Sequence, residues 1–204
     1  MTALVAGAVG LWPAPALAHS PIDGFDGFYL GLLHPLTSAG QVLTLIAVGL
    51  VVGTADKAAF ARAWLLFAAL AFAGVLFGQL LGVSGGEEGA LLGAALLTAL
   101  MVAATPHAAL RRATWMLMAA GVGGLLLGLA STPDEGPLLP TLITVAGSLV
   151  GVNLAFLYLA GATGWVHDRY PYPWARIGLR VVASWVAAIA MLMLALAFAG
   201  IWQV

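Results

Sequence analysis

Residues 138–161 read LLPTLITVAGSLVGVNLAFLYLAG, an apolar stretch without Asp, Glu, Lys or Arg. About 20 such residues in a helix cross the hydrocarbon core of a bilayer, whereas a transmembrane strand shows about ten residues of alternating polarity. Of the whole chain, 63% is hydrophobic and only 7% is charged, against about 25% charged in an average soluble domain. Because backbone groups in lipid must bond within helices or a closed barrel, we predict an all-α, polytopic membrane protein.

Further apolar runs on both sides of this stretch predict a bundle of six transmembrane helices. We place these helices approximately at residues 36–53, 62–83, 88–105, 112–131, 138–161 and 176–202. No connection between them is long enough for a soluble domain. In this interpretation residues 19–204 form a single six-helix transmembrane domain, and its main partner is the lipid bilayer.

The N-terminal segment has the features of a secretory signal peptide. Residues 1–18 are apolar and end in Ala16-Leu17-Ala18, a small-residue pattern that signal peptidase cleaves. The run that precedes Pro13 is too short to span a bilayer, although it lacks the usual Lys or Arg. We predict cleavage after Ala18. The alternative is a retained N-terminal segment that inserts partly into the membrane.

The distribution of charge predicts the orientation of the bundle. With six spans, all seven Lys and Arg residues fall on one side, which the positive-inside rule identifies as cytoplasmic. These residues are Lys57, Arg62, Arg111, Arg112, Arg169, Arg176 and Arg180. The acidic residues Asp23, Asp26, Glu87, Glu88, Asp134 and Glu135 fall on the other side. We therefore expect a protein of the bacterial inner membrane whose mature N- and C-termini are periplasmic.

Composition also limits the function. The formal net charge of −1 offers no basic surface for nucleic acid, so we expect no nucleic-acid partner. The chain contains no Cys, which excludes disulfides, thiolate catalysis and iron–sulfur ligation. No nucleophile–base pair and no cluster of metal ligands is visible along the sequence. We therefore do not expect an enzyme.

Glycines recur every four residues in several of the predicted helices. Such spacing lets helix backbones approach closely in lipid, where van der Waals contact drives association. The pairs and triplets are Gly74, Gly78 and Gly82; Gly124 and Gly128; and Gly147 and Gly151. We predict that the first, second and third spans pack together near the periplasmic face, where the first of these ridges lets the second span lie close against a neighbour.

Polar side chains gather at the start of the first span. Thr37, Gln41 and Thr44 follow His34 at spacings of three or four residues, so they share one helix face and predict a polar path. Glu88 opens the third span. Imidazole and carboxylate suit borderline divalent metals, so His34 and Glu88 are candidate ligands at the periplasmic mouth of a cation path. The alternative is structural: a His bonded to a carbonyl and a Glu that caps a helix.

Other histidines and aromatics have more than one interpretation. After cleavage His19 becomes the N-terminal residue, and its amine and ring could chelate a metal together. The alternative is that a histidine at this position is an accident of the cleavage site. Asp134 could complete a site with His34 if the fold brings them together. We expect His107 and His167 to be solvated in cytoplasmic loops. The aromatic segment from Trp165 to Trp174 predicts an anchor at the headgroup level rather than a binding site.

Several short stretches match a pattern found in one membrane protein family. They are Ala18 through Phe28, Gly31-Leu32-Leu33-His34-Pro35-Leu36, Ala47-Val48-Gly49-Leu50, Gly82-Val83 followed by Glu88-Gly89, and Arg180 through Ala190. In these stretches, and in span number and topology, the chain resembles the HupE/UreJ family. That resemblance implies nickel or cobalt uptake alongside hydrogenase and urease maturation.

The resemblance also identifies two motif positions. The family's first-span motif is His, five residues, then Asp-His; here His34 matches, and Gly40 and Gln41 stand at the last two positions. A second family motif, Phe-His-Gly-x-Ala-His-Gly-x-Glu, falls on Leu126 to Asp134, where only the first Gly and the Ala match and Asp134 replaces the Glu.

Two functions remain open at this point. The first is a permease-like protein for a small cation, such as a divalent transition metal, or for another small solute, with His34, Gln41 and Glu88 near its path. In that case the metal is the transported ion and not a resident cofactor. The second is a non-transporting accessory or assembly subunit, with other membrane protein subunits as partners.

Overall fold

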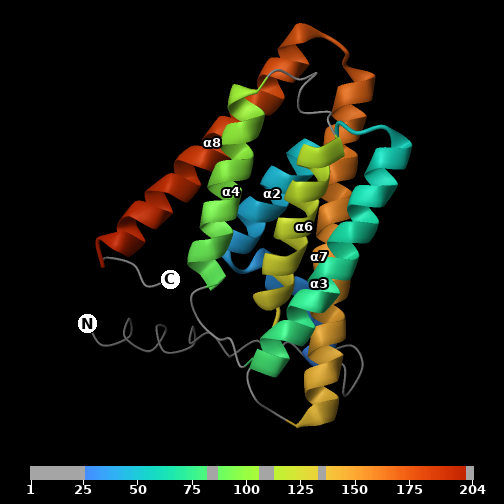
Figure 1. Cartoon of the computed structure of the whole chain (residues 1–204), viewed down its shortest axis with the longest axis vertical. Coiled ribbons are helices and arrows are strands. Elements are labelled where there is room, and N and C mark those ends of the chain that lie inside the picture. The colour runs from blue at the N-terminus through green and yellow to red at the C-terminus, as the bar shows by residue number, and fades with distance from the viewer. Residues whose placement is uncertain (1–25, 82–86, 106–112, 133–136, 201–204) are drawn as a thin grey trace, which may run out of the picture.

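The computed structural model describes residues 26–81, 87–105, 113–132 and 137–200 of the chain. Within these ranges the secondary structure is entirely helical, which confirms the all-α prediction (Figure 1). The elements are α1 (Asp26–Leu33), the 3₁₀ turn η1 (His34–Leu36), α2 (Ala39–Val52), α3 (Lys57–Leu81), α4 (Glu87–Ala104), α6 (Ala113–Leu129), α7 (Leu138–Arg169) and α8 (Pro173–Phe198).

Four of these helices, namely α3, α4, α7 and α8, are long and apolar enough to cross a membrane. A fifth crossing is available if α1, η1 and α2 form one span, because the segments Asp26–Leu36 and Ala39–Val52 pass the same test together but are bent by 66°. Helix α6 is also apolar but has only 17 residues. The first and fourth predicted spans are therefore the ones whose helices are broken or short.

Helix α1 is an element that the sequence did not lead us to expect, and it packs along α7. The contact is a backbone contact through glycines on both helices. A Cβ at Gly147 would overlap the Phe28 carbonyl, and a Cβ at Gly151 would overlap the Leu32 carbonyl. Because only glycine leaves this space free, the ridge on α7 holds α1 against it.

A second close pair joins α3 and α6. A Cβ at Gly124 would overlap the Phe67 carbonyl, and a Cβ at Gly74 would overlap the Leu125 carbonyl, so each helix presents a glycine to the backbone of the other. Gly78 lies against Thr132 in the same seam, and Gly82 lies outside the described residues. The prediction that the first three spans pack together is confirmed for the first and third, since α2 packs against α4, and is wrong for the second, since α3 packs chiefly against α6.

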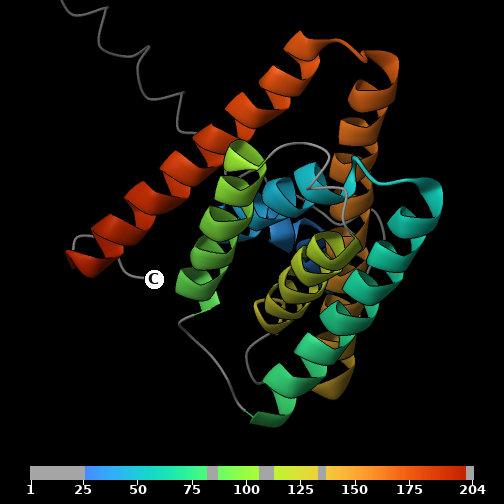
Figure 2. The same cartoon turned by 45° about the horizontal axis from the view of Figure 1, so that its top comes forward.

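Helix α2 lies at the centre of the bundle. It packs against α4, α6, α7 and α8, and nearly all of its residues are buried (Figures 1 and 2). Leu45 and Val48 of α2 join a core that contains the stacked rings of Phe67 and Phe156, whose centroids are 4.3 Å apart. Helix α8 meets α7 at the Tyr170–Tyr172 turn and then diverges from it to pack on α4 (Figure 1).

Candidate functional site

The chain breaks between η1 and α2, and local sequence explains the break. Pro35 lies in the first positions of η1, where its fixed φ suits a helix start. Two residues beyond η1, Ser38 adopts an extended conformation and its Oγ accepts a hydrogen bond from the Gln41 backbone N–H at 3.3 Å. Ser38 is therefore the N-cap of α2, and the helix axis turns at this residue.

A carboxylate from another helix completes this cap. Glu88, in the first turn of α4, accepts hydrogen bonds from Ser38 Oγ at 2.5 Å and from the Gly40 N–H at 2.7 Å. The free N–H groups at the start of a helix carry a partial positive charge that a carboxylate stabilises. Glu88 does cap a helix, as the structural alternative expected, but the helix is α2 and not its own.

Gly40 is what makes room for this carboxylate. A Cβ at residue 40 would lie 2.9 Å from the Cδ and both carboxylate oxygens of Glu88. Any larger residue would therefore push Glu88 away from the N-terminus of α2. The position of the Glu88 carboxylate therefore depends on the absence of a side chain at Gly40.

On the opposite side of the break, His34 connects η1 to α6 and α2. Its Nε2 lies 3.0 Å from the Ala130 carbonyl oxygen and 3.3 Å from Gln41 Nε2. With the proton on Nε2 the ring donates to Ala130, and in the other tautomer the same nitrogen accepts from Gln41. The tautomer of His34 therefore decides whether the ring holds the end of α6 or the side chain of α2.

Gln41 carries an unsatisfied acceptor. Its side chain is 2% exposed, and its Oε1 is buried without a hydrogen-bond partner in the part of the chain that the structure describes. A buried amide oxygen left unpaired costs about 1–3 kcal/mol. Three residues deeper, Thr44 is satisfied, since its hydroxyl donates to the Leu91 carbonyl at 2.9 Å. The break therefore holds one acceptor that an incoming donor or cation would satisfy.

The contacts with α7 show how deep the break lies. Helix α1 meets α7 at Gly147 and Gly151, whereas α2 meets α7 near Leu159, where a Cβ at Gly49 would lie 3.0 Å from the Leu159 Cβ. Residues later in α1 and α2 contact residues later in α7, so α1 and α2 run parallel to α7. At 1.5 Å per residue the break lies about 20 Å along α7 from its first residue. The break is also level with the first turn of α4, which holds Glu88, and with the end of α6, where Ala130 lies. It therefore lies at the mouth that these two helix ends form.

The structure brings some of the predicted site residues together and leaves others apart. His34, Gln41 and Glu88 surround the start of α2, whereas Thr37 is exposed and donates to the His34 carbonyl within its own turn at 2.8 Å. His19 and Asp134 lie outside the described residues. Among the residues that are described, no group of three or more His, Cys, Asp or Glu could hold a metal ion.

The sequence did not reveal two partners of this site. The first partner, the Ala130 carbonyl that faces His34, is a backbone group, so the residue type at position 130 does not predict the contact. The contact of Ser38 with Glu88 joins residues on different helices. The only local signal was the Ser38 position after Pro35, which is typical of an N-cap.

Comparisons with known proteins bear on the family. The family model described as HupE / UreJ protein matches residues 7–194, which is nearly the whole chain. No curated protein and no solved structure matches significantly. From the extent of the match, together with its apolar helices, the chain belongs to the HupE/UreJ family.

Proposed function

We propose that this chain is a permease-like inner-membrane protein that binds a small cation at the break between η1 and α2. The observation that carries the proposal is the buried, unpartnered Oε1 of Gln41. The amide of the same side chain lies beside the His34 ring, and the preceding residue, Gly40, bonds the Glu88 carboxylate. Polar groups at membrane depth are costly and usually functional. Discontinuous helices in transporters also bind ions at their ends, with cations at C-terminal ends and at unwound carbonyls. At the N-terminus of α2 the negative charge for a cation would come from the Glu88 carboxylate.

The proposal includes six membrane crossings. The first is the bent α1–η1–α2 segment, and the others are α3, α4, α6, α7 and α8. Helix α6 would extend about 26 Å, close to the hydrocarbon thickness of about 30 Å, and it is flanked by other helices. This arrangement keeps the Lys and Arg residues of the described ranges at one end, which supports a cytoplasmic location for that end and periplasmic termini. Cleavage after Ala18 stays a prediction, because residues 1–18 lie outside the described part.

The family motif gives this site a chemical interpretation. The HupE/UreJ pattern has Asp and His where this chain has Gly40 and Gln41. The Glu88 carboxylate lies next to the point where the side chain of that Asp would begin. We infer that Glu88 supplies from α4 the carboxylate that the pattern supplies at position 40, while Gln41 offers an amide oxygen in place of an imidazole.

This donor set favours a weakly held substrate over a resident metal. One imidazole, one carboxylate and one amide oxygen suit a divalent cation of borderline or oxygen-preferring character. The Glu88 charge is already partly offset by the N-terminus of α2, which lowers its attraction for a cation. Moderate affinity is what a transport site needs, because the substrate must leave again.

The test is metal accumulation in cells that lack their own uptake systems, with nickel, cobalt and manganese supplied separately. Glu88→Gln keeps an acceptor for the α2 cap but removes the charge, and we expect it to abolish accumulation at unchanged protein abundance. Glu87→Gln is the matched control, since it removes the same charge from the adjacent residue of the same helix turn. Equal accumulation by the two variants would refute the cation site.

A specific observation favours the accessory-subunit alternative. Gly89 and Gly93 lie four residues apart on α4, and a Cβ at either would meet nothing within 4 Å. Such an open small-residue face suits contact with another transmembrane helix. Gly93→Leu should leave the fold intact and release a partner subunit in a co-purification experiment. Unchanged metal uptake in the same variant would separate the partner contact from transport.

A further inference from the structure

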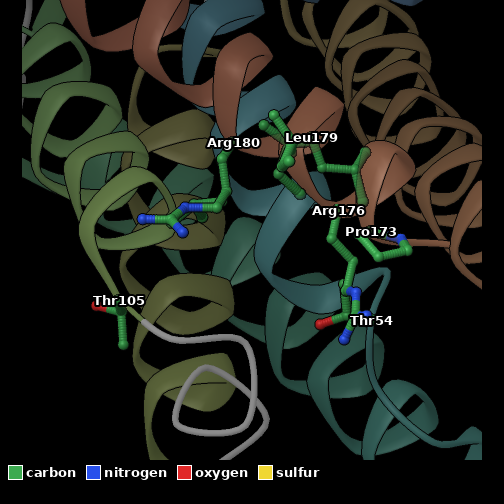
Figure 3. A pocket seen from close by; sticks show the side chains of 9 residues that line it. Thr54, Thr105, Pro173, Arg176, Leu179 and Arg180 are labelled. Atoms are coloured by element: carbon green, nitrogen blue, oxygen red, sulfur yellow. The ribbon is translucent and has the colours of Figure 1, made fainter. Parts of the chain in front are cut away.

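The opposite end of α2 borders a basic cavity. This cavity has a volume of about 270 Å³ and lies between the C-terminal ends of α2 and α4 and the first turns of α8 (Figure 3). Its lining includes Arg176 and Arg180, together with Thr54 and Thr105, and it includes no acidic residue. Two guanidinium groups around a hollow of this kind form a site for an anion.

The two arginines are fixed differently. They lie four residues apart on α8, so they share a face and repel each other. Arg180 Nε donates to the Ala103 carbonyl in the last turn of α4 at 2.8 Å, which holds its guanidinium toward that helix, while the Arg176 side chain points toward Thr54 (Figure 3). Arg176 also borders a neighbouring hollow that Asp168 lines. An anion between the two arginines would relieve their mutual repulsion.

An apolar cleft continues from the basic cavity. It has a volume of about 210 Å³, and Ile46 of α2, Leu159 and Ala162 of α7 and Val182 of α8 line it. Leu50 and Leu179 line both hollows, so the two adjoin. The cleft begins beside the arginines and extends along α2 toward the middle of the bundle. A free phosphate ion would not occupy such an apolar cleft, whereas an acyl chain would.

Aromatic rings place this end of the bundle at a membrane surface. Tyr172 and Trp174 are 57% and 60% exposed, and their rings stack with centroids 6.5 Å apart. Exposed Tyr and Trp side chains concentrate at the headgroup level of a bilayer. Arg176 and Arg180 follow Trp174 on α8 by about 3 Å and 9 Å along the helix axis. They would then lie at or just below the headgroup level, within reach of the lipid phosphates.

We propose that the basic cavity and the apolar cleft together bind one anionic phospholipid. The phosphate lies between Arg176 and Arg180, and one acyl chain lies in the cleft between α2, α7 and α8. This proposal rests on the membrane placement given above, but not on the cation site. Basic pockets between helices at the cytoplasmic side select anionic headgroups by this chemistry. The bound lipid would tie α8, which diverges from α7, to the rest of the bundle.

The experiment is native mass spectrometry of the full chain, delipidated in mild detergent and then offered phosphatidylglycerol or phosphatidylcholine. We expect one phosphatidylglycerol to bind at least about tenfold more tightly than phosphatidylcholine. Both lipids carry the phosphate, but the choline cation of phosphatidylcholine is repelled by the two guanidinium groups. The double variant Arg176→Gln/Arg180→Gln should lose this preference. Arg62→Gln is the control, since Arg62 is an exposed cation near the same end and bonds only the Ala58 carbonyl in its own helix.

A second variant distinguishes a lipid from a free anion. Ala162 is exposed and lines only the apolar cleft, so Ala162→Phe should fill the cleft and weaken lipid binding without touching the arginines. Inorganic phosphate at millimolar concentration should not displace the lipid. Displacement by phosphate together with unchanged binding to Ala162→Phe would overturn the lipid proposal, as would a preserved preference in the double Arg variant. Neither result would affect the accumulation assay on Glu88.

Discussion

At both ends of α2 a charged side chain bonds the backbone at a helix terminus, but the two ends differ in how far their charged groups are satisfied within the protein. At the N-terminal end the Glu88 carboxylate accepts hydrogen bonds from the Gly40 N–H and the Ser38 hydroxyl. At the C-terminal end Arg180 donates to the Ala103 carbonyl in the last turn of α4. Both follow from the polarity of the helix backbone. At the first end both carboxylate oxygens contact protein donors inside the bundle. At the second end Arg176 is exposed and borders a cavity.

This difference teaches which end can be altered without unfolding the protein. Removing the half-buried Glu88 carboxylate leaves its two donors unpaired and is expensive, whereas removing an exposed cation costs little. Substitutions at the N-terminal end should therefore lower the stability more than substitutions at the C-terminal end, although each end has a charged side chain bonded to a helix terminus.

The largest effect is expected from Glu88→Ala. The change leaves Ser38 Oγ and the Gly40 N–H without their acceptor at the start of a buried helix. We expect a loss of about 3 kcal/mol in the free energy of unfolding, seen as a clear drop of the melting temperature in detergent. Glu87→Ala should change it little. Similar melting temperatures for both variants would mean that the cap contributes nothing.

Gly40→Ala should have the next largest effect. The new Cβ would lie 2.9 Å from the Glu88 carboxylate, so the flexible end of Glu88 must move and weaken its two hydrogen bonds. We expect a loss of about 1–2 kcal/mol in stability. Combining Gly40→Ala with Glu88→Ala should cost no more than Glu88→Ala alone. Full additivity in this double-mutant cycle would contradict the coupling of the two residues.

Arg180→Gln tests the other end. It removes the donor to the Ala103 carbonyl, which lies in the last turn of α4. We expect a loss of about 1 kcal/mol, and less than half of that for Arg176→Gln. Thermal melts of the two delipidated variants measure this difference. An equal loss from both would show that the Nε contact has no special value.

Gln41→Leu should change stability little and in either direction. This variant removes the unpartnered buried Oε1 and keeps a similar volume, so stability should stay within about 1 kcal/mol of the parent or rise. Cation accumulation should nevertheless fall sharply, because the proposed oxygen ligand is lost. A stable variant with normal accumulation would remove Gln41 from the site.

Much of the fold followed from the sequence because helix formation is local. The apolar runs predicted helices at α3, α4, α7 and α8, and the Gly147–Gly151 spacing marked a surface of close approach. Pro35 and Ser38 indicated where α2 begins. Each of these inferences needs only neighbouring residues and the requirement that backbone groups in lipid bond within their own helix.

The tertiary structure alone decided which helices meet. Glycine ridges are alike on several helices, so the sequence could not show that α3 pairs with α6 and α1 with α7. The candidate site likewise depends on which helices meet. Glu88 reaches a helix N-terminus almost fifty residues away in the chain, and His34 reaches a backbone carbonyl of α6. Sequence determined the helices because their bonds are internal, whereas the site depends on contacts between helices, which only packing in three dimensions creates.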